Sequence, residues 1–312
     1  MGDRSHCHKG IFALGKRELI VIGIMSTIWG LHFVVMKVAV EIVPPIFYAA
    51  IRMTIVAILM AAFIRWRRGE MKAVFIAGVC FGALNYAFMF TGIKFASASA
   101  TAVAIELYVP FATILSVVFL HEKIGWRRVF GISLAFSGVA LIALGGSGEN
   151  SETKMGLGVG FVALGAFAEA VGSITVKRIK SFKPHELLAW FAVIGAVVLW
   201  PLSFIFEDGQ HQAILDADLS LLIATLIYST IGASIIGHSA YYWLLQRLPV
   251  STVATTTLLT SVIAITSGVL ILGDPFGVLF IAGGAAALLG VAIVMIRTPD
   301  TSADKPSTIE IK

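Results

Sequence analysis

Residues Leu19–Val40 read LIVIGIMSTIWGLHFVVMKVAV, an apolar run in which Lys37 is the only Lys, Arg, Asp or Glu. A bilayer core of about 30 Å requires roughly 20 such residues in a helix. Within lipid, a helix also satisfies its own backbone hydrogen bonds, which an irregular segment does not. The run therefore predicts a membrane-spanning helix. Because it is long enough to span and no small-residue cleavage site follows it, we interpret it as a retained helix and not as a signal peptide.

Further runs of the same character follow, separated by short connections that carry Pro, Gly or charge. The ten expected spans are Leu19–Val40, Pro45–Ile64, Ala73–Ile93, Ala98–Leu120, Trp126–Leu144, Met155–Val176, Glu186–Phe206, Leu219–Leu245, Ser251–Leu272 and Gly277–Ile296. No soluble domain fits between them. The sequence predicts an all-α membrane protein of ten transmembrane helices.

Composition supports lipid as the main solvent of this chain. Of its 312 residues, 58% are hydrophobic and 13% are charged, whereas soluble domains carry about 25% charged residues. Cys7 lies in a polar tail and Cys80 in an apolar run, so no disulfide framework is implied. The HisCysHis stretch at 6–8 has metal-binding side chains, but a disordered tail is the simpler interpretation. We expect no metal and no cofactor.

The basic residues indicate the orientation in the membrane. Most of the 23 lysines and arginines lie in the N-terminal tail, in the connections 65–72, 123–128 and 177–183, or near the C-terminus. The alternate connections carry mainly acids, among them Glu207, Asp208 and Asp274. Because Lys and Arg favour cytoplasmic loops, both termini are predicted to be cytoplasmic, in a multi-pass protein of the inner membrane. The net charge of +5 then needs no nucleic-acid partner.

The two halves of the chain resemble each other. With a shift of 152, Ser99–Val103 aligns with Ser251–Thr255, and His121–Gly125 aligns with Gly273–Gly277. Five helices in each half would make the second half enter the membrane from the opposite side. Such inverted repeats are a transporter architecture with the site between the halves, near the midplane. Chance similarity of apolar segments is the alternative, but the recurring acid-plus-glycine turn favours a repeat.

These observations give the expected domain organisation. A cytoplasmic tail covers residues 1–18, the first five-helix repeat 19–146 and a linker 147–154. The second five-helix repeat covers 155–296, and a second cytoplasmic tail covers 297–312. The two repeats are expected to enclose a central cavity.

Two segments carry a resemblance to a known family. The first copy is Lys94-Phe-Ala-Ser-Ala-Ser-Ala-Thr-Ala, then Pro110-Phe, then Leu120-His-Glu122-Lys; the second is Arg247-Leu-Pro-Val-Ser-Thr-Val-Ala, then Leu272-Gly-Asp274-Pro. They resemble the EamA-type signature of the drug/metabolite transporter superfamily, although Val262 stands where the first copy has Pro110. The resemblance covers about 19–296 and implies ten helices in two inverted repeats that export metabolites or drugs. Within the superfamily, the chain most resembles the YddG-type bacterial amino-acid exporters.

Polar and aromatic residues inside the spans are the candidates for a transport site, since ionisable groups there are costly and mark a pathway by default. Helical spacing places several pairs on shared faces, and the repeat shifts match Trp29 with Glu169 and Tyr86 with His238. Equivalent positions would face one cavity from opposite sides. The predicted substrate-binding residues are Trp29, His32, Asn85, Tyr86, Glu106, Glu169, Ser173, His238 and Tyr242.

Each candidate has a structural alternative. A membrane histidine is often hydrogen-bonded structure, which applies to His32 and His238. Aromatic residues at helix ends, here Trp66, Trp126 and Trp200, are usually interface anchors, whereas Trp29 and Tyr86 lie deeper, where cavity lining is favoured. Arg52 could pair with an acid or reach the outer headgroups. Glu122 and Asp274 sit at helix ends and more simply shape a turn.

Two further features concern helix shape and packing. Pro110 removes a backbone hydrogen bond and should kink its helix. Small residues at Gly131, Ala135 and Gly138, and at Gly283, Ala287 and Gly290, suit close helix packing.

The leading functional hypothesis is a secondary transporter that exports amino acids, including aromatic or other amphipathic ones, and related metabolites by alternating access. Glu106 or Glu169 would bind a substrate ammonium or exchange a proton. The alternative is an exporter of cationic drugs or of other small metabolites, which would use the same carboxylates. The chain shows no HExxH or GxSxG motif and no nucleotide-binding loop, so an intramembrane enzyme and direct ATP drive are disfavoured. A channel would usually show rings of charge, and nothing here suggests one.

Overall fold

The computed structural model describes residues 15–120, 124–145, 149–245, 247–248 and 250–295, and these residues form helices joined by short connections. Across these ranges, nine helices are long and apolar enough to cross a bilayer, and a tenth apolar helix, Thr256–Leu272, is shorter. That tenth helix is part of α13, which begins at Val250. The prediction of an all-α membrane protein is confirmed.

The elements follow the predicted spans closely. The first half contains α1 (Lys16–Ile42), α2 (Pro45–Met60) with η2 (Ala61–Phe63), α3 (Met71–Gly78), η3 (Val79–Leu84), α4 (Asn85–Phe95), α5 (Ala98–Ala104), η4 (Ile105–Leu107), α6 (Tyr108–Leu120) and α7 (Trp126–Leu144). The second half contains α8 (Glu149–Val176), α9 (Pro184–Phe206), α10 (Gln210–Asp216), α11 (Leu219–Ile227), η5 (Tyr228–Gly237), α12 (His238–Leu245), α13 (Val250–Leu272) and α14 (Val278–Met295).

Two details differ from the sequence-based expectation. The helix α8 begins at Glu149, so most of the expected linker 147–154 is helical: once α8 has started, each added residue gains a backbone hydrogen bond. The short helix α10, which we did not predict, occupies the connection after α9. Seven residues are too few to cross a bilayer, so α10 does not change the number of spans.

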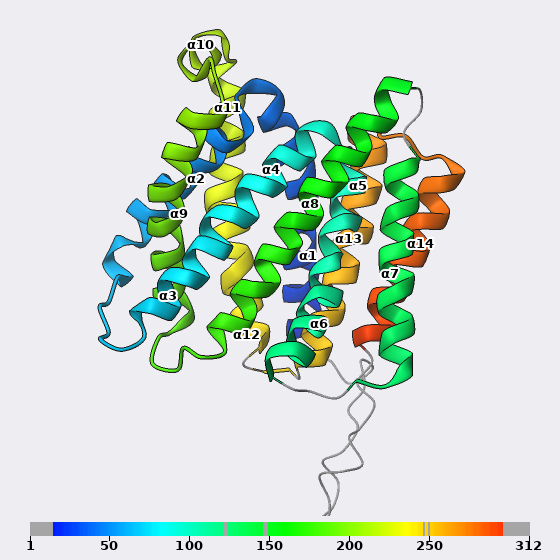
Figure 1. Ribbon diagram of the computed structural model, residues 1–312. Coiled ribbons are helices and arrows are strands. Elements are labelled where there is room, and N and C mark those ends of the chain that lie inside the picture. Colours follow the sequence, from blue (N-terminus) through cyan, green and yellow to red (C-terminus); the bar gives the residue numbers. More distant parts are fainter. Residues whose placement is uncertain (1–14, 121–123, 146–148, 246, 249, 296–312) are drawn as a thin grey trace, which may run out of the picture.

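Successive spanning helices run in alternating directions, and the start of α1 and the end of α14 lie at the same end of the molecule (Figure 1). The basic connections 65–72 and 177–183 lie at this end as well, whereas α10 and its acidic neighbours lie at the other. This separation of charge supports the predicted orientation, which stays a prediction.

Small residues bring α7 and α14 close together. A Cβ atom added to Gly131 would lie 2.8 Å from the Gly290 carbonyl oxygen, and one added to Gly283 would lie 2.6 Å from that of Gly138. Because backbone faces backbone at these points, no larger side chain fits without moving a helix. The predicted close packing through these glycines is confirmed.

The helix pairings are consistent with a two-fold repeat. The second, fourth and fifth spans of one half pack on the same spans of the other half: α2 packs on α9, α5 on α13 and α7 on α14. In addition, α1 contacts α13 and η5, while α8 contacts α6 and η3. Exchanging the two halves leaves this set of pairings unchanged. The inverted repeat itself stays a prediction that these pairings support.

The third spanning helix of each half contains a π-helical segment. These are η3 in the first half and η5 in the second. The shift of 152 carries 79–84 onto 231–236, which lies inside η5. A π-segment closes hydrogen bonds from i to i+5, which widens the helix, and such segments occur frequently at functional sites. The centre of each half therefore has a distorted turn at an equivalent place.

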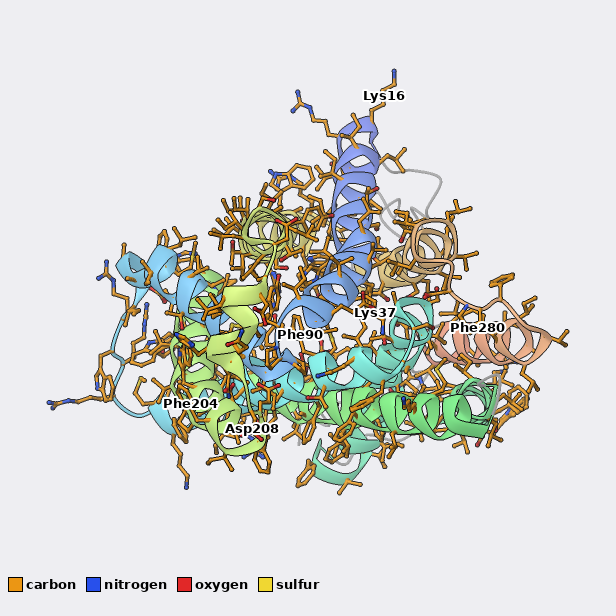
Figure 2. The ribbon with its side chains drawn as sticks, turned by 90° about the horizontal axis from the view of Figure 1, so that it is seen from above. Lys16, Lys37, Phe90, Phe204, Asp208 and Phe280 are labelled. Atoms are coloured by element: carbon orange, nitrogen blue, oxygen red, sulfur yellow. The ribbon has the colours of Figure 1, made fainter. Side chains whose placement is uncertain are left out.

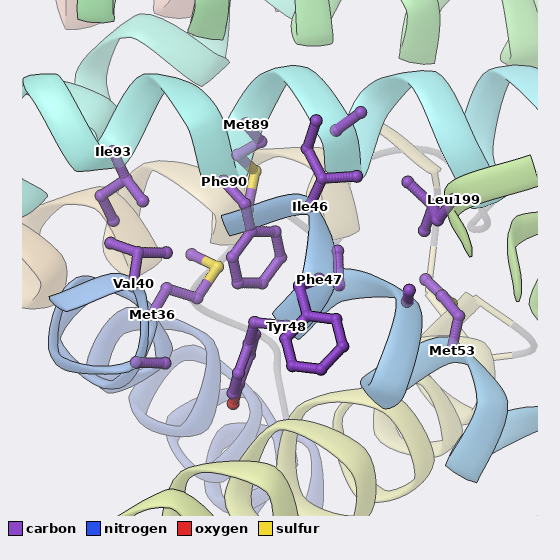
Figure 3. Close-up of a cluster of buried hydrophobic side chains, with 14 of the residues drawn as sticks. Met36, Val40, Ile46, Phe47, Tyr48, Met53, Met89, Phe90, Ile93 and Leu199 are labelled. Carbon is purple, nitrogen blue, oxygen red and sulfur yellow. The ribbon is translucent and has the colours of Figure 1, made fainter. Parts of the chain in front are cut away.

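A hydrophobic cluster fills the middle of the molecule between α1, α2 and α4. Met36, Tyr48 and Phe90 are fully buried in it, and Phe90 lies near the centre of the view from above (Figure 2). Figure 3 shows Phe47 and Phe90 within the cluster and the Tyr48 hydroxyl at its edge. The polar tip of Tyr48 thus leaves the apolar cluster, and its partners belong to the candidate site.

A long-range contact stabilises the first turn of α5. Asp274, between α13 and α14, accepts hydrogen bonds from the Ser99 backbone nitrogen and hydroxyl at 2.7 and 2.6 Å. It therefore satisfies an otherwise free N–H in the first turn of α5. Its expected counterpart Glu122 lies outside the described residues. Before Pro110, η4 interrupts the α-helical path, consistent with the predicted disturbance.

Candidate functional site

Polar side chains from α1, α2 and η5 meet in the interior of the molecule. His32 comes from α1, Tyr48 and Arg52 come from α2, and Ser229 and Ser234 come from η5; all five are buried. We call these five residues the arginine cluster. A polar group in an apolar interior is costly unless it is hydrogen-bonded, and the contacts within the cluster meet that requirement for all but one of its donors.

Ser229 is the centre of the arginine cluster. Its hydroxyl lies 3.1 Å from His32 Nε2 and 2.9 Å from the Tyr48 hydroxyl. Its backbone carbonyl accepts hydrogen bonds from Arg52 Nε at 3.3 Å and from the Ser234 hydroxyl at 3.0 Å. One residue of the π-segment thus joins α1, α2 and η5.

Arg52 brings a positive charge into the cluster, and only 1% of its surface is exposed. Nη2 donates to the Ser234 hydroxyl at 2.9 Å, and the guanidinium carbon lies 4.5 Å from the centre of the Tyr86 ring. Nη1 is buried and has no hydrogen-bond acceptor among the described residues. The face of Tyr86 stabilises the cation, but one nitrogen of the fork remains unused.

The expectation that Arg52 pairs with an acid or reaches the outer headgroups is wrong. In the described part of the chain, the ion pairs join Lys37 to Glu41 and Arg67 to Glu186. The Arg52 side chain turns inward because η5 offers carbonyl and hydroxyl acceptors there. A cation inside the span is thus held by neutral groups.

Trp29 and His238 extend the arginine cluster along η5. Trp29 Nε1 donates to the Ala233 carbonyl at 3.0 Å, and its ring meets the His238 ring edge-on at 5.4 Å. His238 Nδ1 lies 3.2 and 3.0 Å from the carbonyls of Ala233 and Ser234. Trp29 is therefore packed against η5 and α12 inside the bundle.

A second group of polar residues, the carboxylate cluster, contains Glu106, Glu169, Asn85 and Ser261. Glu106 Oε1 accepts a hydrogen bond from the Ser261 hydroxyl at 2.7 Å. Glu169 Oε2 accepts one from Asn85 Nδ2 at 3.2 Å, and the same amide donates to the Gly165 carbonyl at 3.0 Å. The segment η4, which carries Glu106, packs against α8, which carries Glu169. Neutral donors hold both acids.

Ser173 lies on the same helix as Glu169, one turn away. Its hydroxyl is 3.1 Å from that of Tyr108 on α6. The predicted face of Glu169 and Ser173 on α8 therefore packs against α6.

Two consecutive residues connect the clusters. Asn85 and Tyr86 are the first residues of α4, directly after η3. The Asn85 amide reaches Glu169, while the Tyr86 ring lies beneath Arg52. Trp29 and its expected counterpart Glu169 fall in different clusters, so the predicted set divides into two groups joined at this point. The Tyr242 side chain lies outside the described residues.

A hollow of about 280 Å³ opens beside the arginine cluster at the basic end of the molecule. The residues that line it are Met60, Phe63, His185, Leu188, Ile235, His238 and Ser239. His238 forms part of its wall and also contacts the Ser234 carbonyl. His238 lines the hollow and contacts Ser234, and Ser234 contacts Arg52, so these two residues separate the hollow from Arg52.

Sequence reasoning selected the two buried acids and Asn85 but missed Ser261 and most of the arginine cluster. Arg52 gave a signal, since it is a charge within a span, and a better weighing of that cost would have selected it. Tyr48, Ser229 and Ser234 gave none, because hydroxyls are common in membrane helices and many bond their own backbone, as Thr54 does.

The ten-helix bundle with buried polar clusters defines a multi-pass membrane transporter. The sequence pattern of the EamA-like transporter family matches residues 16–144 and 156–296, and the chain belongs to this family. It is a transporter and not an enzyme.

Relatives agree with this assignment, and a solved structure agrees with the fold. An uncharacterized transporter of Archaeoglobus fulgidus is 28% identical over 89% of this chain and 99% of its own length. Proteins named "Probable amino-acid metabolite efflux pump" are 26% identical in Salmonella typhimurium and 25% in Escherichia coli, each over 90% of this chain and 95% of the relative. A crystal structure aligns with a TM-score of 0.59 and 17% identity over 90% of this chain and 96% of the other, which supports the fold alone.

Proposed function

We propose that this transporter exports amino acids and related amphipathic metabolites by alternating access. The observation that carries the proposal is the pair of acids, Glu106 and Glu169, held in the interior by the neutral donors Ser261 and Asn85. An ionised carboxylate within a span costs at least about 2.5–3.5 kcal/mol on insertion scales. A substrate ammonium would offset that cost during transport, because it brings the missing positive charge.

The carboxylates of the carboxylate cluster have acceptor positions that could bind such an ammonium group. A carboxylate offers about four acceptor positions; Glu106 accepts from the Ser261 and Thr257 side chains, and Glu169 accepts from the Asn85 amide. Tyr86, the residue after Asn85 on α4, and Trp29, beside His238, supply aromatic rings that would pack against an apolar substrate side chain. Two relatives named as amino-acid metabolite efflux pumps support this substrate class.

Alternating access requires each half to move against the other. The two π-segments lie at equivalent places and interrupt regular helix geometry at the level of the clusters. Both would act as the points at which the third helices of the halves bend. With both termini cytoplasmic, as the basic connections favour, the hollow beside His238 would open toward the cytoplasm and receive substrate for export.

A flux experiment tests the proposal. The purified protein in liposomes should exchange radiolabelled amino acids in a counterflow assay with a panel of side chains. Glu169→Gln should lower that exchange at least about tenfold while the protein still inserts, because the variant keeps the shape and removes the charge. Glu41→Gln, an exposed acid on α1, is the matched control. Wild-type exchange by Glu169→Gln would end the proposed role, and no exchange of any amino acid would end the proposed function.

The second candidate is an exporter of cationic drugs, which the same two acids would serve. It predicts that substrates need a positive charge and no carboxylate. The arginine cluster bears on this choice.

A further inference from the structure

The buried arginine on α2 has more hydrogen-bonding capacity than the protein uses. A guanidinium has five N–H donors in a fixed fork. Nε donates to the Ser229 carbonyl and Nη2 to the Ser234 hydroxyl, while Nη1 is buried with no acceptor among the described residues. Buried donors are normally satisfied, and an exception calls for an explanation.

The charge of Arg52 also lacks a partner of opposite sign among its contacts. Arg52 stays positively charged under all ordinary conditions, and its neighbours in the cluster are hydroxyls, a carbonyl and the Tyr86 ring. Its contacts position the guanidinium firmly but bring no negative charge, and the ion pairs of the described chain lie elsewhere. The arrangement suits a partner that arrives, binds and leaves.

We propose that Arg52 is the binding site for the carboxylate of the transported substrate. The two N–H groups on Nη1 would donate charge-assisted hydrogen bonds to it. Nε and Nη2 are already tied to η5, so the fork is held in one orientation before the substrate binds. This pre-organisation lowers the cost of binding.

Position supports this assignment. Arg52 is seven residues after Pro45, the first residue of α2, so it lies about 10 Å inside the span at a rise of 1.5 Å per residue. Tyr86 contacts it and follows Asn85, which contacts Glu169. Arg52 and Glu169 therefore both contact the first turn of α4. A substrate would approach Arg52 from the hollow beside His238, past Ser234.

The inference rests on the proposed function and narrows its substrate class. A substrate would need a free carboxylate as well as an ammonium group, which describes amino acids and excludes amines, amino-acid amides and most cationic drugs. Glu106 and Glu169 would serve the ammonium end, and Arg52 would serve the acid end.

The test compares probes that differ in one group. L-phenylalanine, L-phenylalaninamide and 3-phenylpropionate share a ring, but the amide lacks the carboxylate and the propionate lacks the ammonium. In competition with labelled L-phenylalanine in liposomes, the amide should bind at least about tenfold more weakly to the wild type. Arg52→Gln should abolish this preference for the acid, and Arg52→Lys, which keeps the charge, should retain part of it. Arg68→Gln, an exposed arginine, should behave as wild type.

The outcomes separate this inference from the proposed function. A wild type that accepts amide and acid equally, or an Arg52→Gln variant that still prefers the acid, overturns the carboxylate site while leaving amino-acid export intact. If no amino acid is transported, the proposed function fails, and the carboxylate site is then tested by thermal stabilisation with 3-phenylpropionate. Stabilisation of the wild type and of Arg68→Gln, but not of Arg52→Gln, supports the site. No stabilisation of the wild type overturns the site. Should Arg52→Gln not fold, the wild-type probe series and Arg52→Lys decide between the same two outcomes.

Discussion

The arginine cluster and the carboxylate cluster differ in charge, although both are built from helices of both halves of the chain. Each adjoins a π-segment, η5 for the first and η3 for the second. The first holds a cation with hydroxyls and a carbonyl, and the second holds two acids with a hydroxyl and an amide. Backbone geometry is similar in the two places, but side-chain chemistry is not.

This difference has a physical reason. Equivalent helices can keep one distortion while each half acquires its own polar residues, since the distortion depends on the backbone and the chemistry depends on single side chains. A substrate with two unlike ends suits a site of this kind. Substitutions in the two clusters test the comparison, and their expected effects range from the loss of most transport to a few-fold change.

Reversing the charge of the arginine cluster should have the largest effect. In Arg52→Glu, a buried acid would face the Ser229 carbonyl and the Ser234 hydroxyl without a cation. An uncompensated buried charge costs about 3–5 kcal/mol, and since 1.4 kcal/mol is a factor of ten, flux should fall at least about 100-fold. Counterflow and a melting curve measure this, with Arg68→Glu as the control. Flux above a tenth of the wild-type value would show that the cluster needs no cation.

A third acid in the carboxylate cluster should have the next largest effect. Asn85→Asp removes the amide that donates to Glu169 at 3.2 Å and sets a like charge beside it. Loss of a donor to a buried group costs about 1–3 kcal/mol, so flux should fall about 10- to 50-fold. Asn85→Ala, which removes the donor alone, should lose less in the same counterflow assay. Equal losses for the two variants would mean that charge repulsion plays no part.

Crowding at the end of η5 should have an intermediate effect. A Cβ atom at Gly237 would run into Nε1 of the Trp29 indole, which already donates to the Ala233 carbonyl. Overpacking of this kind costs about 1–3 kcal/mol, so Gly237→Ala should lower the melting temperature and cut flux about 10- to 25-fold. Gly232→Ala is the matched control in the same π-segment, because the nearest atom to its Cβ is 3.8 Å away. If the two variants behaved alike, the contact with Trp29 would have no role.

Removing single hydroxyls should have the smallest effect and should compare the clusters directly. Tyr48→Phe deletes the bond to Ser229, and Tyr108→Phe deletes the bond to Ser173. A neutral hydrogen bond contributes about 0.5–1.5 kcal/mol, so each variant should keep flux within about threefold to tenfold of wild type. We expect the larger loss for Tyr48→Phe, because Ser229 also holds Arg52. The opposite order in parallel counterflow assays would place the more sensitive network around Glu169.

Much of the architecture could be predicted from the chain. Ten apolar runs, the basic connections and the glycines of α7 and α14 follow from local rules: each helix must be long enough to span and must bond its own backbone. Glu106 and Glu169 could also be selected, because a charge within an apolar run is conspicuous. The helix α10 and the helical start of α8 were missed, since polar residues near a span can continue a helix or leave it.

The sequence by itself determined which segments are apolar enough to cross the membrane and which residues are out of place there. Only the tertiary structure decided what those residues contact. Arg52 finds Ser229 and Ser234, which are 177 and 182 positions away in the chain, and Lys37 donates to the carbonyls at the end of α4. Hydropathy is a property of neighbours along the chain, whereas a polar partner depends on the rotation and tilt of a helix packed beside it. For that reason the acids were visible in the sequence, and the unused nitrogen of Arg52 was visible only in the fold.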